Sequence, residues 1–356
     1  MNTTITDATS TPEELKARWD ELLEANPKLR IRNAAEELGV SEAELLATQC
    51  GETVTRLSVT DWEAFMQSWK SLGRVMVLTR NDNCVHEKTG VYEQIHPLMH
   101  GGKVGLTTGK DIDLRLFMGG WKHAFAVEDL SIPGGHSRSL QIFDPTGTAI
   151  HKIYVKSDEG IEPFHKLVEQ YRAEDQSKAL SVEAPEAKRP EMPDAQIDKD
   201  ALLDGWKNLK DTHDFFPLLM KTRVAREQAL RLADGVFTRK VDNSAARKVL
   251  DLASERGTSI MVFVGNDHCI QIHTGPVKKV MEYQDWYNVM DPSFNLHLKE
   301  SGIASCWHVR KPTADGEVNS LEVFDKDGEV IVQFFGERKP GSPELEAWRE
   351  LLSDIS

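Results

Sequence analysis

The sequence lacks the surplus of positive charge that is typical of proteins that bind nucleic acid. It has 356 residues, with 43 Lys and Arg against 57 Asp and Glu, so its formal net charge is -14. A protein that binds nucleic acid without sequence preference needs a basic face that displaces counterions from the phosphates. The overall charge therefore disfavours general nucleic-acid binding, although it leaves room for a local basic pocket.

Cysteine is scarce and long apolar runs are absent. The four cysteines (Cys50, Cys84, Cys269 and Cys306) form no CxxC pair, and free thiols in a reducing compartment are their simplest explanation. No apolar run approaches the roughly 20 residues that a membrane-spanning helix needs. Residues 1–23 are polar and then amphipathic, unlike a signal peptide. We therefore expect a cytoplasmic protein.

Common nucleotide-binding and hydrolase motifs are also missing, since no GxGxxG, P-loop or GxSxG pattern stands out. The sequence has an internal repeat instead. "VMVLTRNDNCVHEKTGVYEQI" from Val75 aligns with "IMVFVGNDHCIQIHTGPVKKV" from Ile260. "SLQIFDPTGTAIHKIYV" from Ser139 aligns with "SLEVFDKDGEVIVQFFG" from Ser320, and "IDLRLF" (112–117) with "FNLHLK" (294–299). Two halves of one fold, packed with approximate twofold symmetry, are the expected result.

The order of elements within each half predicts an α+β fold. Helical patterns come first, short β-branched runs separated by turn signals follow, and one helical pattern closes each half. Because no long helices alternate with the strands, the sheets should be antiparallel. Residues 173–200 contain three prolines and many charges and are expected to be a linker between an amino-terminal half (12–172) and a carboxy-terminal half (201–356).

The stretch "KDTHDFFPLLMK" places a histidine, His213, in an apolar pattern. Leu202, Trp206, Leu209, His213, Phe216 and Met220 are spaced 4, 3, 4, 3, 4, which predicts one helical face. His213 is then either a core histidine bonded to a neighbour or a ligand that points into an apolar pocket. No HxxxH, CxxC or carboxylate cluster completes a zinc site around it, so the aromatic flanks favour haem iron as its metal.

Arg115 lies in the predicted strand "DIDLRLFM". Side chains alternate along a strand, so Asp113, Arg115 and Phe117 should point one way and the two intervening leucines the other. The second copy has His297 at the aligned position. Arg115 is either a solvent-facing residue or one that looks across the twofold into a pocket of the other half.

Scattered cations of the second half, Arg226, Lys311 and Arg338, would each alone be read as solvated surface charges. They gain interest if an anionic ligand needs them, because Arg and Lys bind carboxylates such as the two propionates of haem. His86 aligns with Gln271, and we expect it to be a surface histidine, with a secondary contact to haem as the alternative.

The segment 32–48 resembles a helix-turn-helix. A helix that reads DNA should carry Lys, Arg, Asn or Gln toward the groove, but "SEAELLAT" offers two glutamates and no cation. We interpret this segment as a structural helical corner.

Together, "MVFVGNDHCIQIHTGPVKKV", "IDLRLF" and the block from "DPSFNLHLKESG" to "PGSPELEAW" resemble the HemS/ChuS family. These are bacterial cytoplasmic haem-binding proteins, also called hemin-degrading factors or haem-trafficking proteins, and the resemblance covers residues 12–350. It implies two similar halves, each with a large antiparallel sheet and flanking helices, with the sheets stacked centrally in pseudo-twofold symmetry.

The resemblance also implies roles for individual residues. His213 becomes the axial ligand of the iron in haem b, and Arg115 becomes a distal arginine supplied by the first half, which is catalytic only if the protein is an enzyme. The remaining implied contacts are three cations near the propionates, a phenylalanine on the porphyrin and two residues that line the pocket. These are Arg226, Lys311, Arg338, Phe263, Gln333 and Phe335. Some relatives have tyrosine in place of Phe335, so a phenolic hydroxyl is missing here.

The function implied by the resemblance is haem binding and trafficking in iron uptake. The protein would accept haem from an inner-membrane ABC importer and deliver it to a haem oxygenase. The alternative is an enzyme that opens the macrocycle with an electron donor, and a third hypothesis is a regulator that binds DNA through the helical corner. The first two require the same pocket, so the sequence does not separate them.

Overall fold

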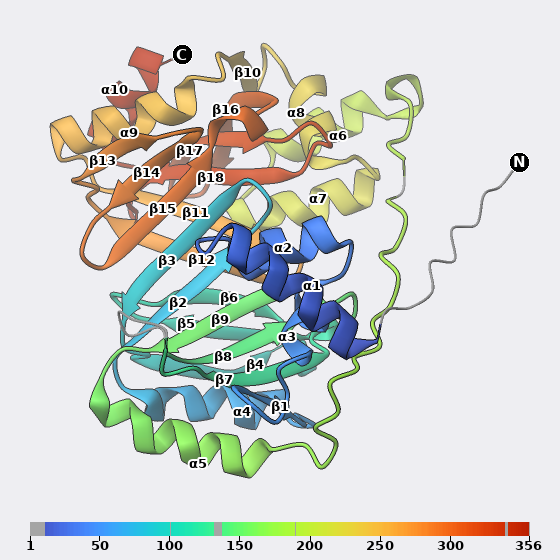
Figure 1. The fold of residues 1–356 in the computed structure, drawn as a ribbon. Coiled ribbons are helices and arrows are strands. Elements are labelled where there is room, and N and C mark those ends of the chain that lie inside the picture. The colour runs from blue at the N-terminus through green and yellow to red at the C-terminus, as the bar shows by residue number, and fades with distance from the viewer. Residues whose placement is uncertain (1–10, 100, 132–136, 189, 339–340, 356) are drawn as a thin grey trace, which may run out of the picture. The chain divides into compact units, whose positions relative to one another are not determined.

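The computed structural model describes residues 11–99, 101–131, 137–188, 190–338 and 341–355 (Figure 1). The chain divides into two compact units that do not coincide with the sequence repeats. Unit 1 comprises the described residues up to Val77 together with Ile95–Gly105 and Leu116–Glu186. Unit 2 comprises Leu78–Gln94, Leu106–Arg115 and the described residues from 187 onward, so it takes segments from both repeats.

The described strands form two nine-stranded sheets, which confirms the α+β, antiparallel prediction. The first sheet has the spatial order β1 (Val54–Leu57), β7 (His123–Glu128), β8 (Arg138–Phe143), β9 (Ala149–Val155), β2 (Val75–Arg80), β3 (Cys84–Gly90), β15 (Phe294–Lys299), β14 (Trp286–Met290) and β13 (Val280–Tyr283). The second has the order β10 (Thr238–Val241), β16 (Ser305–Thr313), β17 (Gly316–Phe324), β18 (Val330–Gly336), β11 (Ile260–Asn266), β12 (Cys269–Gly275), β6 (Asp113–Phe117), β5 (Val104–Thr108) and β4 (Gln94–Met99). Each sheet thus combines six strands of one repeat with three of the other.

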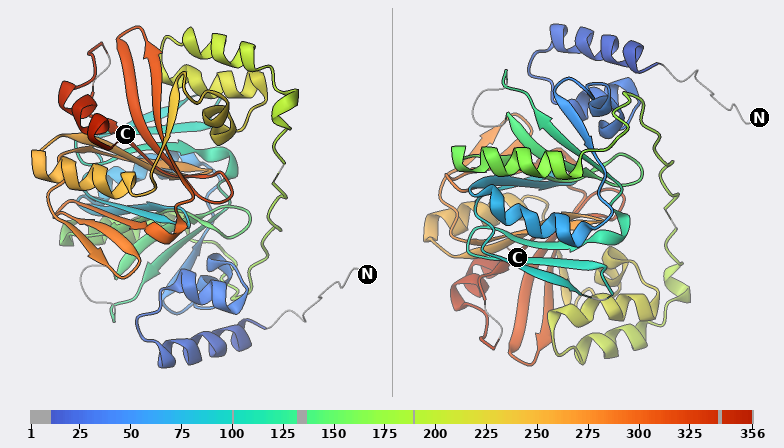
Figure 2. Two further views of the ribbon diagram at one scale, coloured as in Figure 1. Left: turned by 90° about the horizontal axis from the view of Figure 1, so that it is seen from above. Right: turned by 90° about the horizontal axis from the view of Figure 1, so that it is seen from below.

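The described part of unit 1 contains five α-helices, three of which are capped by a side chain. They are α1 (Pro12–Ala25), α2 (Ile31–Leu38), α3 (Glu42–Ala47), α4 (Trp62–Ser68) and α5 (Ile161–Tyr171). The side chains of Thr11, Ser41 and Asp61 cap α1, α3 and α4. The α2–α3 pair is the predicted helical corner: Gly39, at φ 71°, ends α2, and Ser41 caps α3. The first residue of α3, Glu42, is buried and ion-paired with Lys152, so its side chain packs inside the protein and does not face solvent. Helices α4 and α5 lie side by side on one face of the sheet (Figure 1, Figure 2) and join through the rings of Phe65 and Tyr171, 5.0 Å apart.

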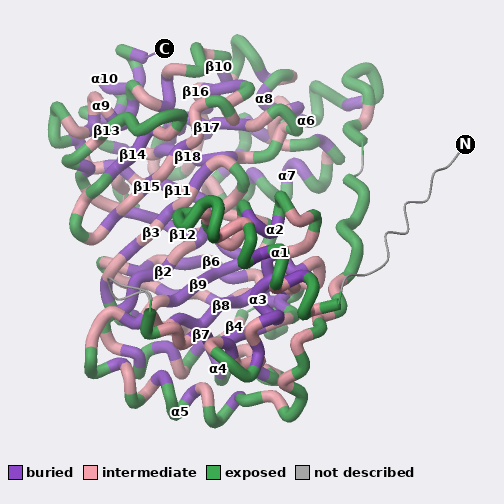
Figure 3. The backbone as a smooth tube through the Cα atoms, viewed as in Figure 1, coloured by how far each residue is buried: buried purple, intermediate pink, exposed green. Residues whose placement is uncertain are grey.

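The helices of unit 2 pack on the second sheet and on the carboxy-terminal strands. They are α6 (Lys199–Lys207), α7 (Phe215–Thr222), α8 (Arg226–Leu232), α9 (Ala245–Arg256) and α10 (Glu346–Ile355). One core cluster joins α6, α7 and α8 to β16 and contains Trp206, Phe215 and Trp307. The indole of Trp206 also donates a hydrogen bond to the carbonyl of Arg310 at 2.9 Å. This cluster fixes the amino-terminal end of α7 against the sheet. Figure 3 colours the backbone by burial, and most of the central strands are buried or intermediate in it.

Aligned residues of the two repeats contact each other inside unit 2. Gln271 Nε2 lies 2.9 Å from His86 Nδ1, and Lys88 Nζ lies 3.3 Å from His273 Nδ1. His86 is fully buried, so its prediction as a surface histidine is wrong. Burial, followed by the neighbouring His273 and Lys88, holds the pKa of His86 well below its usual value. The contacts between equivalent positions match the pseudo-twofold relation that the repeat predicts.

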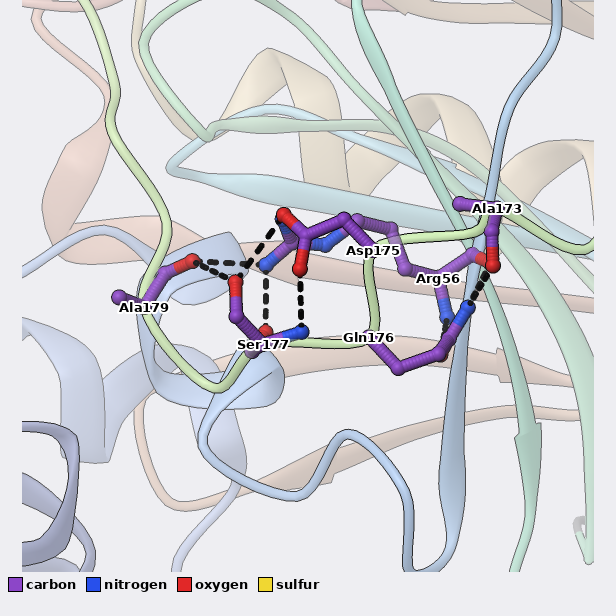
Figure 4. A network of polar contacts seen from close by, with 6 residues as sticks. All are labelled: Arg56, Ala173, Asp175, Gln176, Ser177 and Ala179. Atoms are coloured by element: carbon purple, nitrogen blue, oxygen red, sulfur yellow. Dashed lines mark hydrogen bonds and ion pairs between the residues drawn. The ribbon is translucent and has the colours of Figure 1, made fainter.

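The segment from Ala173 to Pro193 has no helix or extended strand among its described residues, as the composition predicted. It is nevertheless tied down, because Arg56 of β1 donates hydrogen bonds to the carbonyls of Ser177 and Ala179 at 2.8 and 2.7 Å (Figure 4). Gln176 closes the same network through the backbone N–H and carbonyl of Arg56. In the described part of the chain no helix is long and apolar enough to cross a membrane.

Candidate functional site

His213 does not lie on one continuous amphipathic helix, so that prediction is wrong. Helix α6 ends at Lys207, a 3-10 turn occupies Thr212–Asp214, and α7 begins only at Phe215. The side chain of His213 is 88% exposed, which also rules out the reading as a core histidine. Phe216 and Met220, the next residues of the predicted apolar face, are 65% and 64% exposed. An imidazole and two apolar side chains therefore lie open at the start of α7.

Two aspartates hold the turn that carries His213. Asp211 Oδ1 accepts a hydrogen bond from the backbone N–H of His213 at 2.8 Å and also contacts the imidazole Nδ1. Asp214 Oδ2 accepts from the backbone N–H groups of Lys210 and Asp211 at 3.1 and 3.0 Å. Sequence reasoning missed Asp211, although the spacing Asp-x-x-Asp before an apolar run is the signal of a capping box. Because Asp211 occupies Nδ1, Nε2 is the ring nitrogen of His213 for which the described residues provide no partner.

The strand registers bring Phe263, Gln333 and Phe335 together on one face of the second sheet. Phe263 pairs with Gln333 across β11 and β18, and residues that are directly opposite project from the same face. Phe335 lies two residues beyond Gln333, so it shares that face. The rings of Phe263 and Phe335 meet edge to face with centroids 5.0 Å apart. Phe263, predicted to pack on the porphyrin, and the two residues predicted to line the pocket are thus neighbours.

The same face carries a buried ionic triad. Glu322, which pairs with Gln333 across β17 and β18, accepts hydrogen bonds from Arg226 Nε at 2.7 Å and from Lys311 Nζ at 2.8 Å. Both Glu322 and Lys311 are buried, so the reading of Lys311 as a surface charge is wrong. The ring of Phe215 lies 4.6 Å from Lys311 Nζ and 5.3 Å from the guanidinium of Arg226. Through Phe215 the triad is connected to the turn of His213.

The charges of the triad are strongly coupled. Burial by itself raises the pKa of Glu322, but the two cations outweigh it and hold that pKa far below its usual range. Burial lowers the pKa of Lys311, and Glu322 opposes that effect. Since one carboxylate serves two cations, the triad keeps one positive charge that could meet an anionic ligand.

Two further predicted residues have buried donors without partners. Among the described residues, no acceptor reaches Gln333 Nε2 or Arg338 Nη1. Arg338 also helps to lower the pKa of Asp211 through its charge, and it lines a cavity of about 380 Å³ with Glu337, Ser342, Pro343 and Leu345. Leaving a buried donor unpaired costs roughly 1–3 kcal/mol. These donors would be satisfied by an anionic or carbonyl-bearing ligand.

Arg115 occupies the position on β6 that alternation predicted. Leu114 and Leu116 are fully buried, whereas the Arg115 side chain is 34% exposed and pairs with Asp113 on its own face. Strand β6 lies next to β12 in the second sheet. No described contact joins Arg115 to His213 or to the ionic triad, so its distal role stays a prediction.

The arrangement does not resemble a site for a free metal ion. Among the described residues, no group of three or more His, Cys, Asp or Glu side chains could hold one. A single accessible imidazole suits a metal whose other ligands arrive with it, as in a porphyrin.

Two copies of one family domain account for most of the chain. The profile of the haemin-degrading HemS.ChuX domain matches residues 39–171 and 223–355. The chain therefore belongs to this family of duplicated α+β proteins.

Particular relatives match over nearly their full length. The hemin transport protein HemS of Yersinia enterocolitica is 36% identical over 348 residues, which are 96% of this chain and 98% of that protein. The hemin transport protein HmuS of Yersinia pestis is 37% identical and covers 93% of this chain and 94% of its own.

Solved structures confirm the fold. Holo-PhuS, a heme-binding protein from Pseudomonas aeruginosa, is 47% identical with a TM-score of 0.92, covering 98% of this chain and 99% of that one. ChuS, a heme-degrading enzyme of Escherichia coli O157:H7, is 32% identical with a TM-score of 0.85, covering 97% and 99%.

Proposed function

We propose that this protein binds one haem b through His213 and passes it on during bacterial haem-iron uptake. The observation that carries the proposal is the exposed imidazole of His213, which Asp211 clamps so that Nε2 stays free. It gains weight because the chain is similar along its length to hemin transport proteins and to a heme-binding protein.

The surroundings of His213 fit a flat, apolar ligand with two carboxylates. The exposed side chains of Phe216 and Met220 offer apolar contact, worth about 25 cal/mol per Å² removed from water. The unpaired donors of Gln333 and Arg338 suit carboxylate oxygens. In this proposal His213 binds the iron, the donors orient the propionates, and the ionic triad holds Phe215 and the start of α7 in place.

Delivery and degradation are the two functions that such a site serves. For delivery, the protein would receive haem from an inner-membrane ABC importer in the cytoplasm and hand it to a haem oxygenase. Degradation is the second candidate because the similar protein ChuS is a heme-degrading enzyme. In that case the guanidinium of Arg115 would stabilise negative charge that develops on the distal side. We favour binding and delivery.

A hemin titration of the wild type and of His213→Ala tests the binding site. We expect a dissociation constant on the order of micromolar or tighter for the wild type, and an altered Soret band with faster haem loss for the variant. His165→Ala is the matched control, since the His165 side chain is also exposed, at 50%, but lies on α5 in unit 1. A variant His213→Ala whose spectrum equals that of the wild type would remove this residue from the iron.

A second experiment separates delivery from degradation. The haem complex is supplied with ascorbate, with and without catalase, and the Soret band is followed. For a delivery protein we expect the band to persist when catalase removes peroxide, because loss that occurs only without catalase reflects coupled oxidation. Loss of the band at the same rate with catalase present would favour the enzyme.

A further inference from the structure

We infer that Asp211 is a positioning residue that fixes the tautomer and the direction of the His213 imidazole and thereby tunes the iron that it binds. Nothing in the similarity to known proteins assigns a role to this aspartate. Its effect on iron rests on the proposed function, whereas its effect on the imidazole can be measured without any ligand.

The geometry determines which nitrogen carries the proton. Asp211 Oδ1 contacts Nδ1 of His213 and also accepts the backbone N–H of the same residue at 2.8 Å. An ionised carboxylate only accepts hydrogen bonds, so Nδ1 must be the donor. In a neutral imidazole the lone pair is then on Nε2, the nitrogen that does not contact Asp211.

Backbone hydrogen bonds on both sides hold the Asp211 carboxylate and its turn in place. The carboxylate accepts the backbone N–H of His213 at 2.8 Å. The reciprocal bond from the backbone N–H of Asp211 to Asp214 closes the turn at 3.0 Å. The carboxylate is therefore a fixed acceptor and not a side chain that happens to be nearby.

This clamp matters because the imidazole is otherwise free. A side chain that is 88% exposed would sample several rotamers and both tautomers, and binding would have to select one of them. A carboxylate behind a ligating imidazole removes that cost and makes the imidazole a stronger donor. Partners of this kind typically contribute 10–100-fold to metal affinity.

A ligand-free experiment tests the tautomer directly. The ring nitrogens of His213 are followed by ¹⁵N NMR in the ligand-free protein, at a pH high enough that their shifts no longer change with pH. We expect the wild type to carry its proton on Nδ1 and Asp211→Ala to move it toward Nε2. Equal nitrogen shifts in the two proteins would overturn the inference.

The haem complex tests the effect on iron. Asp211→Asn keeps an oxygen that can accept the backbone N–H but removes the charge behind the imidazole. We expect haem to dissociate at least about 10-fold faster. We also expect the preference for ferrous over ferric iron to rise about tenfold, which is about 59 mV in reduction potential.

Asp214→Asn is the matched control. It neutralises a carboxylate in the same turn that contacts backbone N–H groups and not the imidazole. Its potential should move by a small fraction of the shift seen for Asp211→Asn. Equal shifts in the two variants would mean that charge near the turn, and not contact with the imidazole, is responsible, and would overturn the inference.

The outcomes also separate this inference from the proposed function. If His213→Ala leaves the hemin spectrum unchanged, the proposed function fails, while the ligand-free tautomer remains a valid test of Asp211. If the hemin spectrum depends on His213 but Asp211→Asn behaves like the wild type, only the inference fails.

Discussion

Replacing Glu322 with glutamine should destabilise unit 2 more than a typical single substitution. The side chain of Glu322 has 0% exposure and bonds to both Arg226 and Lys311. Glutamine has nearly the same shape, so the change removes charge without creating a cavity. It leaves Lys311, whose side chain is 3% exposed, without its counter-charge.

The magnitude follows from this burial. Breaking a buried ion pair by removing one partner costs about 3–5 kcal/mol, since a buried charge remains uncompensated. The amide oxygen of glutamine can still accept one hydrogen bond, which places our expectation at about 3 kcal/mol. The matched control is Glu282→Gln, because Glu282 pairs with Arg247 at 2.8 Å but is 60% exposed. An exposed pair of this kind contributes about 0–1 kcal/mol.

Urea unfolding, followed by tryptophan fluorescence, measures both variants. The pH dependence gives a second readout. Because the pKa of Glu322 is depressed, its stabilisation is present above the unfolded-state pKa of about 4.3 and is lost only as pH falls toward the folded-state value. In Glu322→Gln the pKa of Lys311 should fall further, so the deficit should shrink toward about pH 10 as Lys311 loses its proton. A deficit equal to that of Glu282→Gln at neutral pH would refute the reasoning.

Two further predictions concern other parts of the fold. Gly160→Ala should lower the free energy of unfolding by roughly 1–3 kcal/mol, because its new Cβ would lie 2.3 Å from the carbonyl oxygen of Leu72. In Gly119→Ala the new Cβ meets no atom within 4 Å, so this control should be nearly neutral. Thermal unfolding of both variants measures the difference. Burial, followed by the charge of Lys88, lowers the pKa of His273 to about 3. As pH falls, the unfolded chain therefore binds a proton at this histidine before the folded chain does. The free energy of unfolding should decrease below about pH 6.5, by up to about 1.4 kcal/mol per pH unit. His273→Gln should reduce that slope in denaturation midpoints measured from about pH 7 to pH 4, and an unchanged slope would contradict the assignment.

The repeat made the fold predictable, but local periodicity misled the reading of His213. The spacing of Leu202 and Trp206 does mark a buried helical face, which ends with α6, and Leu209 is buried just beyond it. The helical spacing of apolar residues continues by coincidence from α6 into α7, although the chain leaves the helix between them. The residues between the two helices happen to be of a number that keeps the spacing in step. The capping pattern of Asp211 and Asp214 marks the 3-10 turn that precedes the second helix, and it should have outweighed the periodicity.

Strand β3 shows a second reason why a prediction from sequence alone can be wrong. Its burial alternates regularly, but the buried positions are Cys84, His86, Lys88 and Gly90, and Val85 is half-buried. Hydrophobicity alone therefore assigns the wrong face to the core. The polar side chains are buried because their repeat-related partners, Gln271 and His273, complete their contacts. Such pairing depends on tertiary structure and has no local sequence signal.

The exchange of strands between repeats has a consequence for truncated genes. Strand β15 pairs with β3 along Phe294–Leu298, and β12 lies next to β6, so both carboxy-terminal strands have neighbours from the first repeat. A fragment that starts after residue 200 would present two bare strand edges, and such edges promote aggregation. A second fragment could supply the missing strands by swapping. Fusing two copies into one polypeptide makes that pairing independent of concentration.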